Sequence, residues 1–198
     1  MINFINISTE EPYNIFKKRY DEASSASQKN IEAVAISSYD KKKEEVDSRF
    51  VNIKFIDEDN FIFFTNYNSP KSIAFQTNNQ IGALFYWSSI DSQIRMKAKI
   101  YRTSEKYNLE YFKNRNNDKN ALALSSNQSA KIDSYEDVLK KYQQIKKSEN
   151  LKECPDFWGG FHFKPYYFEF WTGDSSRINK REVFEFKGKD WQKYFLEP

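Results

Sequence analysis

The chain has 198 residues, with 31 basic and 28 acidic side chains and a formal net charge of +3. Its basic run at 41–43 is followed directly by Glu44-Glu45, which indicates a solvated turn and argues against a nucleic-acid-binding patch. No apolar run approaches the length of a membrane span and Met1 to Ile7 lacks the features of a signal peptide, so we expect a single cytoplasmic domain over 1–198.

In the first part of the chain, the pattern predicts one long helix followed by three strands. The helix is expected over 11–24, because apolar side chains recur along one face, and Thr9 is its possible cap. Strands are expected at 31–38, 49–56 and 61–65, with 49–65 forming a hairpin.

A short helix is expected to begin at Ser69-Pro70-Lys71. Serine suits the cap position, and proline suits the first helical position, where its missing N–H costs nothing. The N-terminus of a helix beside a lysine is typical of an anion-binding site.

The second part of the chain predicts strands on either side of a helical insert. Strands are expected at 81–87 and 93–103, helices from 104 or 105 to 115, at 120–124 and at 134–147, and further strands at 161–163, 167–172, 182–186 and 191–196. This order favours a barrel-like α+β domain over a parallel doubly wound sheet. No glycine-rich loop follows a strand, so a Rossmann site is not expected.

The chain contains one cysteine, Cys154, and one histidine, His162. These counts exclude an intrachain disulfide and a zinc site built from Cys and His clusters, and no metal site is predicted. Cys154 beside Pro155 is expected in a loop, and His162 on a strand. Any catalysis must come from a cofactor or from carboxylates, lysines and arginines.

The most informative stretch is the last quarter, where Arg177 and Arg181 lie six and ten residues after Trp171. Guanidinium groups suit phosphates and carboxylates. The order of these elements resembles the C-terminal signature of the pyridoxamine 5'-phosphate oxidase family, and the resemblance extends over about 12–198. It implies an FMN-binding split β-barrel with peripheral helices, with 1–10 as an N-terminal arm and 161–198 as a dimerisation and signature region.

The resemblance also implies a set of FMN-binding residues. They are Arg49, Phe50, Val51, Lys54, Phe64, Thr65, Lys71, Gln93, Gln128, Ser129, Trp171 and Arg181. In the family, the counterpart of Arg49 contacts the FMN phosphate, that of Gln93 lies against the flavin ring, and the loop of Gln128 reaches the cofactor of the neighbouring subunit. From spacing alone, Arg49 and Lys54 would point to opposite faces of their strand unless the strand bends. The alternative without a functional role is that both cations face solvent.

A second set is implied for the substrate: Lys54, Tyr111, Arg115, Lys119, Arg177 and Asn179, with Arg177 and Asn179 as the catalytic candidates. Tyr111 and Arg115 lie four apart on one helical face, where the family binds the phosphate of the B6 vitamer. The spacing alone fits an amphipathic helix with solvated cations equally well.

Four positions depart from the family pattern. Pro70 stands where members commonly have arginine, and Lys119 where they have serine. Asn179 replaces a histidine, and Lys180 replaces an acid. Asparagine forms hydrogen bonds but does not titrate near neutral pH as histidine does, so substrate affinity and choice depend on these changes.

The function implied by the resemblance is that of a homodimeric oxidase with FMN sites at the subunit interface. It would convert pyridoxamine or pyridoxine 5'-phosphate to pyridoxal 5'-phosphate and pass electrons to dioxygen, giving hydrogen peroxide. One alternative is a family member that binds FMN or pyridoxal phosphate with little oxidase activity. Another is a flavin reductase or oxidase with a different substrate, because fold does not determine function.

Overall fold

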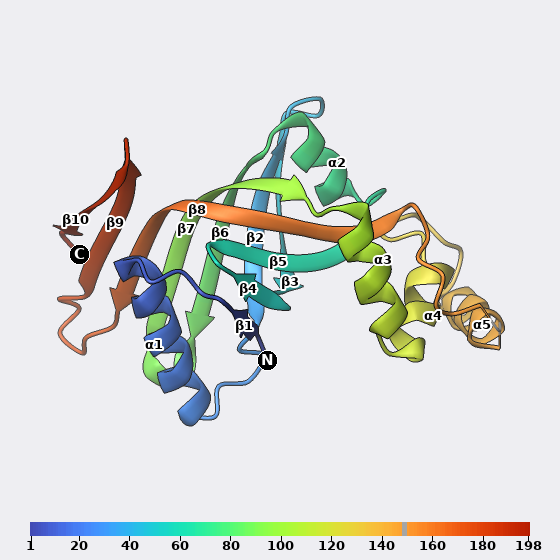
Figure 1. Ribbon diagram of the computed structural model, residues 1–198, viewed down its shortest axis with the longest axis horizontal. Coiled ribbons are helices and arrows are strands. Elements are labelled where there is room, and N and C mark those ends of the chain that lie inside the picture. The colour runs from blue at the N-terminus through green and yellow to red at the C-terminus, as the bar shows by residue number, and fades with distance from the viewer. Residues whose placement is uncertain (148–149) are drawn as a thin grey trace.

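The computed structural model describes residues 1–147 and 150–198, in which the strands form one mixed sheet with helices around it (Figure 1). The strands are β1 (Asn3–Ile5), β2 (Ala33–Asp40), β3 (Glu45–Asn52), β4 (Phe55–Asp57), β5 (Asn60–Asn66), β6 (Gln80–Trp87), β7 (Ser92–Arg102), β8 (Trp158–Thr172), β9 (Lys180–Lys187) and β10 (Asp190–Leu196). The helices are α1 (Glu11–Ser25), α2 (Pro70–Thr77), α3 (Glu105–Asn114), α4 (Asn117–Ser125) and α5 (Tyr135–Lys146), with a 3₁₀ turn at Ser88–Ile90. The predicted α+β class is confirmed.

The main path of the sheet runs β1-β4-β5-β8-β7-β6-β2-β3, and β9 and β10 extend it from β8. β1 pairs with β4 in parallel, and the remaining pairs are antiparallel. Within the described residues, no helix combines the length and apolar character needed to cross a membrane.

β8 is one strand of 15 residues, whereas the sequence predicted separate strands at 161–163 and 167–172. The predicted break between the two strands is therefore wrong. In the structure, Pro165 lies opposite Ala98, and the register shifts between Lys97 and Ala98. Such a bulge accommodates a residue that lacks an N–H without ending the strand.

The predicted hairpin over 49–65 is only partly present, because the chain changes neighbours at 53–54. β3 pairs with β2, whereas β4 pairs with β5. At the change, the N–H of Ile53 bonds to the carbonyl of Glu32 (2.9 Å), and the N–H of Lys54 bonds to the carbonyl of Ile62 (2.8 Å). The backbone therefore stays hydrogen-bonded while it bends from one side of the sheet to the other.

In the N-terminal segment, β1 adds to the edge of the sheet and Ile2 is buried. The predicted Thr9 cap is wrong. Glu10 occupies the N-cap position of α1 without a side-chain hydrogen bond, and a proline lies in the first turn. α4 begins three residues before its predicted start at 120, because the side chain of Asn116 accepts hydrogen bonds from the N–H groups of Asp118 and Lys119.

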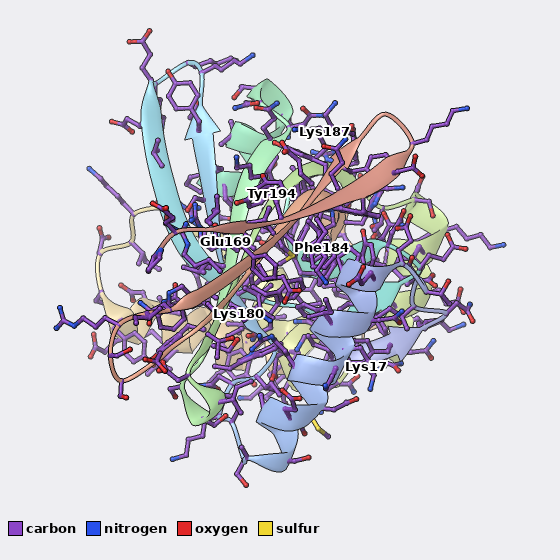
Figure 2. All side chains as sticks on the ribbon, turned by 90° about the vertical axis from the view of Figure 1, so that its left-hand side faces the viewer. Lys17, Glu169, Lys180, Phe184, Lys187 and Tyr194 are labelled. Carbon is purple, nitrogen blue, oxygen red and sulfur yellow. The ribbon has the colours of Figure 1, made fainter. Side chains whose placement is uncertain are left out.

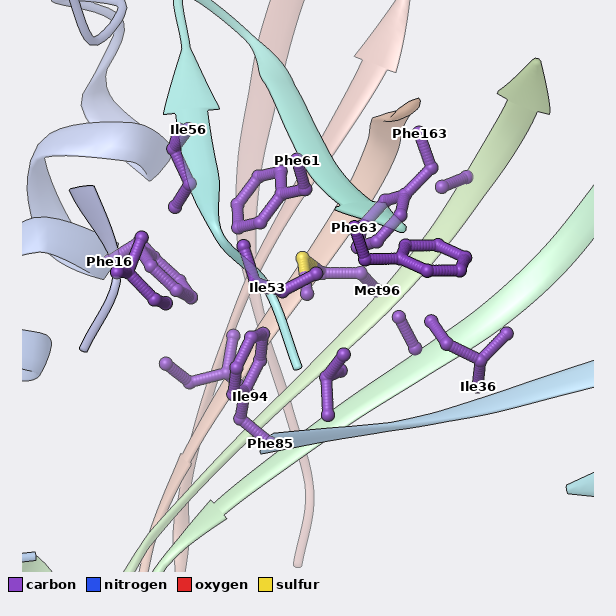
Figure 3. Close-up of a cluster of buried hydrophobic side chains, with 14 of the residues drawn as sticks. Phe16, Ile36, Ile53, Ile56, Phe61, Phe63, Phe85, Ile94, Met96 and Phe163 are labelled. Carbon is purple, nitrogen blue, oxygen red and sulfur yellow. The ribbon is translucent and has the colours of Figure 1, made fainter. Parts of the chain in front are cut away.

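The core lies between α1 and the sheet and is rich in phenylalanine (Figure 3). Phe61 is fully buried at its centre. Its ring stacks on Phe163 at 5.1 Å between centroids and meets Phe16 edge-on at the same separation. These contacts join α1, β5 and β8, so the core connects the first helix to the longest strand.

Replacing Phe61 by alanine removes these ring contacts and leaves a cavity. We expect the free energy of unfolding to fall by roughly 3–5 kcal/mol, measured by urea denaturation. Tyr135→Ala is the control, because Tyr135 is 70% exposed and its loss should change stability by less than about 0.5 kcal/mol. Equal effects of the two substitutions would contradict this account of the core.

Candidate functional site

A cavity of about 850 Å³ lies among β3, β5, α2, α3 and the loops around Lys54 and Gln128. The structure brings twelve of the predicted site residues to its lining: Arg49, Phe50, Val51, Lys54, Phe64, Thr65, Lys71, Tyr111, Arg115, Lys119, Gln128 and Ser129. These residues come from segments far apart in the sequence. We refer to this cavity as the cationic pocket.

The charge of the cationic pocket is strongly unbalanced. Its lining holds five cations, Arg49, Lys54, Lys71, Arg115 and Lys119, against one carboxylate, Asp47. A larger groove of about 1030 Å³ elsewhere has a mixed lining in which Lys164 forms an ion pair with Asp59. The cationic pocket is therefore the better site for an anionic ligand.

Lys71 gives the clearest sign that the pocket is built for an anion. The residue is only 4% exposed, and its Nζ donates a hydrogen bond to the hydroxyl of Ser69 at 3.1 Å. No carboxylate among residues 1–147 and 150–198 forms an ion pair with it. Burial, and secondarily the nearby Arg49, lower the pKa of Lys71 to about 8. A buried cation without a counter-ion is costly, and a bound phosphate would offset that cost.

The bend at 53–54 explains how Arg49 and Lys54 reach the same cavity, although regular spacing would place them on opposite faces. Arg49 forms an ion pair with Asp47, and burial lowers the pKa of its guanidinium. Burial also lowers the pKa of Lys54; Glu32 opposes this shift, and the positive charges of Lys119 and Arg115 reinforce it.

The α2 end of the pocket offers backbone donors. Ser69 occupies the N-cap position as predicted, but it does not cap the helix with its side chain. Its hydroxyl instead donates to the carbonyl of Asn66 at 2.8 Å and lies 2.9 Å from the hydroxyl of Ser72. The first N–H groups of α2 therefore lack a side-chain cap and are suited to an anion.

Three stacked rings form one wall beside the pocket. The ring of Phe64 lies 3.8 Å from that of Tyr111 and 5.2 Å from that of Trp158, with the planes nearly parallel. The guanidinium of Arg115 lies over Trp158 at 5.0 Å. The rings of Tyr111 and Trp158 lie only 6.2 Å from each other, so they do not sandwich the Phe64 ring between them.

Trp158 was missed as a site residue, although the two glycines after it were a usable signal. A side chain at Gly159 would collide with Tyr67 and Asn108. The strand can approach α3 only because these positions lack a Cβ, and that approach brings Trp158 against the ring of Phe64.

The loop of Gln128 lies at the pocket of its own chain, whereas the resemblance assigned it to the cofactor of a neighbouring subunit. The side-chain oxygen of Gln128 accepts hydrogen bonds from the hydroxyl of Thr65 (3.0 Å) and the N–H of Asn66 (3.3 Å). These contacts fix the loop to β5.

The remaining predicted residues are outside the cationic pocket and form a second group near β9. Gln93, Trp171 and Arg181 lie opposite one another on β7, β8 and β9. Arg177 and Asn179 are in the loop between β8 and β9. We refer to these five residues as the C-terminal group.

Hydrogen bonds hold the C-terminal group in place. Figure 2 looks onto β9 and β10, with Glu169 behind them. Glu169 is 2% exposed and forms ion pairs with Arg181 (2.8 Å) and Arg95 (2.9 Å). In the loop, the side-chain oxygen of Asn179 accepts a hydrogen bond from the N–H of Asp174 at 3.1 Å, and Arg177 has a positive φ of 64°. Asn179 therefore helps to shape the loop.

One chain does not bring the two groups together. β5 pairs with the start of β8, where Thr65 lies opposite Gly159, while Trp171 is twelve residues further along. At about 3.3 Å per residue, this is roughly 40 Å along the strand. In Figure 1, β9 lies on one side of the molecule and α3 on the other.

Comparison with known proteins identifies the family. Residues 158–198 match the family model described as the pyridoxine 5'-phosphate oxidase C-terminal dimerisation region. The pyridoxine/pyridoxamine 5'-phosphate oxidase of Colwellia psychrerythraea is 34% identical over 194 residues, covering 96% of this chain and 88% of that protein. The chain belongs to the pyridoxine/pyridoxamine 5'-phosphate oxidase family. The predicted membership in a family of FMN-dependent oxidases is thus confirmed.

Solved structures confirm the split-barrel fold of this family member. PhzG from Burkholderia lata, in complex with tetrahydrophenazine-1-carboxylic acid, superposes with a TM-score of 0.89 at 23% identity, covering 96% of this chain and 93% of PhzG. A pyridoxamine 5'-phosphate oxidase-related, FMN-binding protein from Nostoc punctiforme gives a TM-score of 0.79 at 11% identity, covering 96% and 100%. At these identities the likeness shows the fold alone.

Lys71 predicts how cofactor affinity changes with pH. Above about pH 8 the lysine is neutral in the empty pocket, so FMN binding must then include the uptake of a proton. We expect the affinity for FMN to be constant below this pH and to fall above it by up to about tenfold per pH unit. Quenching of flavin fluorescence between pH 7 and 9.5 measures it.

Lys71→Met is the matched variant, because it keeps a long side chain and removes the titrating group. It should bind FMN more weakly and with a flatter pH profile. A wild-type affinity that stays constant to pH 9.5 would show that Lys71 does not contact the anion.

Proposed function

We propose that the whole chain acts as one FMN-binding unit that oxidises pyridoxamine or pyridoxine 5'-phosphate to pyridoxal 5'-phosphate, with dioxygen as the electron acceptor and hydrogen peroxide as the product. The observation that carries this proposal is the arrangement of cations in the cationic pocket. The positive charge of Arg49 lowers the pKa of Lys71, and the positive charges of Lys119 and Arg115 lower the pKa of Lys54, so each lysine lies near other cations. Two clusters of positive charge suit two phosphates, one from the cofactor and one from the substrate.

The first cluster would hold FMN. Arg49, Lys71 and the uncapped N-terminus of α2 form a donor set suited to the cofactor phosphate. Pro70, in the first turn, has no N–H to offer, so this chain relies on the other donors of the helix. Bound FMN would supply the two-electron redox chemistry of the reaction.

The second cluster would bind the substrate phosphate. Lys54, Arg115 and Lys119 supply its charge, and the hydroxyl of Tyr111 adds a donor at the same wall. Lys119 adds a cation where the family pattern has serine, which strengthens the attraction to a phosphate dianion.

We propose that the active unit is a homodimer in which the C-terminal group of one subunit completes the cationic pocket of the other. Gln93, Trp171 and Arg181 would approach the flavin, while Arg177 and Asn179 would cover the substrate. Two observations support this: the roughly 40 Å of strand along β8 between the position opposite Thr65 and Trp171 within one chain, and the match of 158–198 to a dimerisation region.

The second candidate function is vitamer binding with little turnover. Asn179 is the observation that favours it, because its side-chain oxygen is engaged by the N–H of Asp174 and its amide does not titrate near neutral pH. On this alternative, the protein would retain FMN and a phosphorylated vitamer without transferring electrons between them.

Anaerobic reduction tests the proposed function. The FMN-loaded protein is mixed with pyridoxine or pyridoxamine 5'-phosphate without oxygen, and flavin absorbance is followed before air is admitted. We expect bleaching, then recovery of absorbance with formation of pyridoxal 5'-phosphate and hydrogen peroxide. Bound flavin that stays oxidised would refute the oxidase proposal and favour the second candidate.

Subunit complementation tests the shared site. Arg49→Ala should disable the cationic pocket, and Arg181→Ala should disable the C-terminal group. If each site takes residues from both subunits, each variant alone is inactive, whereas mixed subunits recover roughly a quarter of wild-type activity, because half of the dimers contain one intact site. Co-refolded variants of equal concentration provide the measurement. No recovery, with dimers shown by light scattering, would mean that each site is built within one chain.

A further inference from the structure

A buried amide next to the cationic pocket contacts one of its arginines. Asn120 in α4 is fully buried. Its Nδ2 donates to the carbonyl oxygens of Phe112 (3.0 Å) and Leu151 (2.8 Å), and its Oδ1 accepts a hydrogen bond from Nη1 of Arg115 at 3.3 Å. Because carbonyl oxygens only accept, the two donated bonds determine which way the amide points. Its oxygen is therefore a fixed acceptor for Arg115.

The other contacts of Arg115 fall on the same part of the side chain. Nη1 also donates to the backbone carbonyl of Lys119 at 2.8 Å, and the guanidinium lies over the ring of Trp158. In the described parts of the chain, the hydrogen bonds of this guanidinium use Nη1, and no carboxylate forms an ion pair with it. Nε and Nη2 remain as donors toward an anion in the pocket.

We propose that Asn120 is a positioning residue that orients Arg115 for the substrate phosphate. This inference rests on the proposed function, because it takes the phosphate of the B6 vitamer as the ligand of Arg115. A free arginine side chain loses rotamer entropy when it binds a ligand. Fixing Nη1 beforehand reduces that loss and leaves the two remaining nitrogens for a bidentate contact with phosphate.

Asn120 is held by segments on both sides, and this fixes the position of its contact with Arg115. Phe112 belongs to the last turn of α3, and Leu151 is a buried residue beyond α5. The amide therefore connects three segments that are separate in the sequence. Arg115 lies at the C-terminal end of α3, so its backbone and its guanidinium are anchored at the same place.

A double-mutant cycle on the FMN-loaded protein tests the proposal, with pyridoxal 5'-phosphate as the probe and calorimetry as the measurement. Asn120→Ala should weaken binding of the probe about tenfold and raise KM for the phosphorylated substrate similarly, while kcat and FMN affinity change less than about twofold. In an Arg115→Ala background, Asn120→Ala should have no further effect. Additive losses in the double variant would overturn the proposal and leave a structural role.

Matched variants separate positioning from folding. Asn117→Ala, at the exposed start of the same helix, should bind the probe like the wild type. If Asn120→Ala does not fold, Asn120→Ser keeps a hydroxyl that can donate to a carbonyl oxygen, while its shorter side chain loses the acceptor for Arg115, and it should weaken the probe to a similar extent. Unchanged affinity in Asn120→Ser would overturn the proposal.

Binding and turnover of the wild-type protein separate a failure of the oxidase proposal from a failure of the proposal on Asn120. Wild-type protein that binds pyridoxal 5'-phosphate but does not oxidise its reduced forms would refute the oxidase function, and the cycle would still test Asn120. Wild-type protein that does not bind the probe would overturn the role of Asn120 together with the substrate assignment.

Discussion

The continuous ladder along β8 is the constraint on which the rest of the structure depends. This strand bonds to β5 at its start, to β7 along most of its length and to β9 at its end. Its start holds Trp158 against Phe64, which builds one wall of the cationic pocket. Its end aligns Gln93, Trp171 and Arg181 in one row. Because a single strand carries both Trp158 and Trp171, the separation of these two residues is built into the chain.

Charge compensation differs between these two ends. Near the end of β8, the buried Glu169 forms ion pairs with both Arg95 and Arg181. Around the pocket, Arg49 alone of the five lining cations forms an ion pair with a described carboxylate, and the side chain of Lys71 is almost completely removed from water. The fold therefore supplies a buried counter-ion near the C-terminal group and none among the described carboxylates at Lys71, where a ligand would supply it.

Local patterns predicted much of this arrangement. Periodicity predicted the ends of α1, α3 and α5 to within one or two residues. It could do so because the apolar pattern of an amphipathic helix is contained in a short stretch of sequence. Ordered motifs, compared with a known family, predicted twelve of the residues that line the pocket. The change of partner at Ile53 escaped detection, because it depends on hydrogen bonds to Glu32 and Ile62 that a local pattern does not contain. Asn120 was missed for the same reason.

The unpaired cations of the pocket also bear on how long the protein survives in a cell. A ligand that binds only the folded chain stabilises it by mass action. Because this fold concentrates positive charge that it does not neutralise, the empty form carries a penalty that an anion removes. We therefore expect chains made when the ligand is scarce to unfold more often and to be degraded faster than ligand-bound chains.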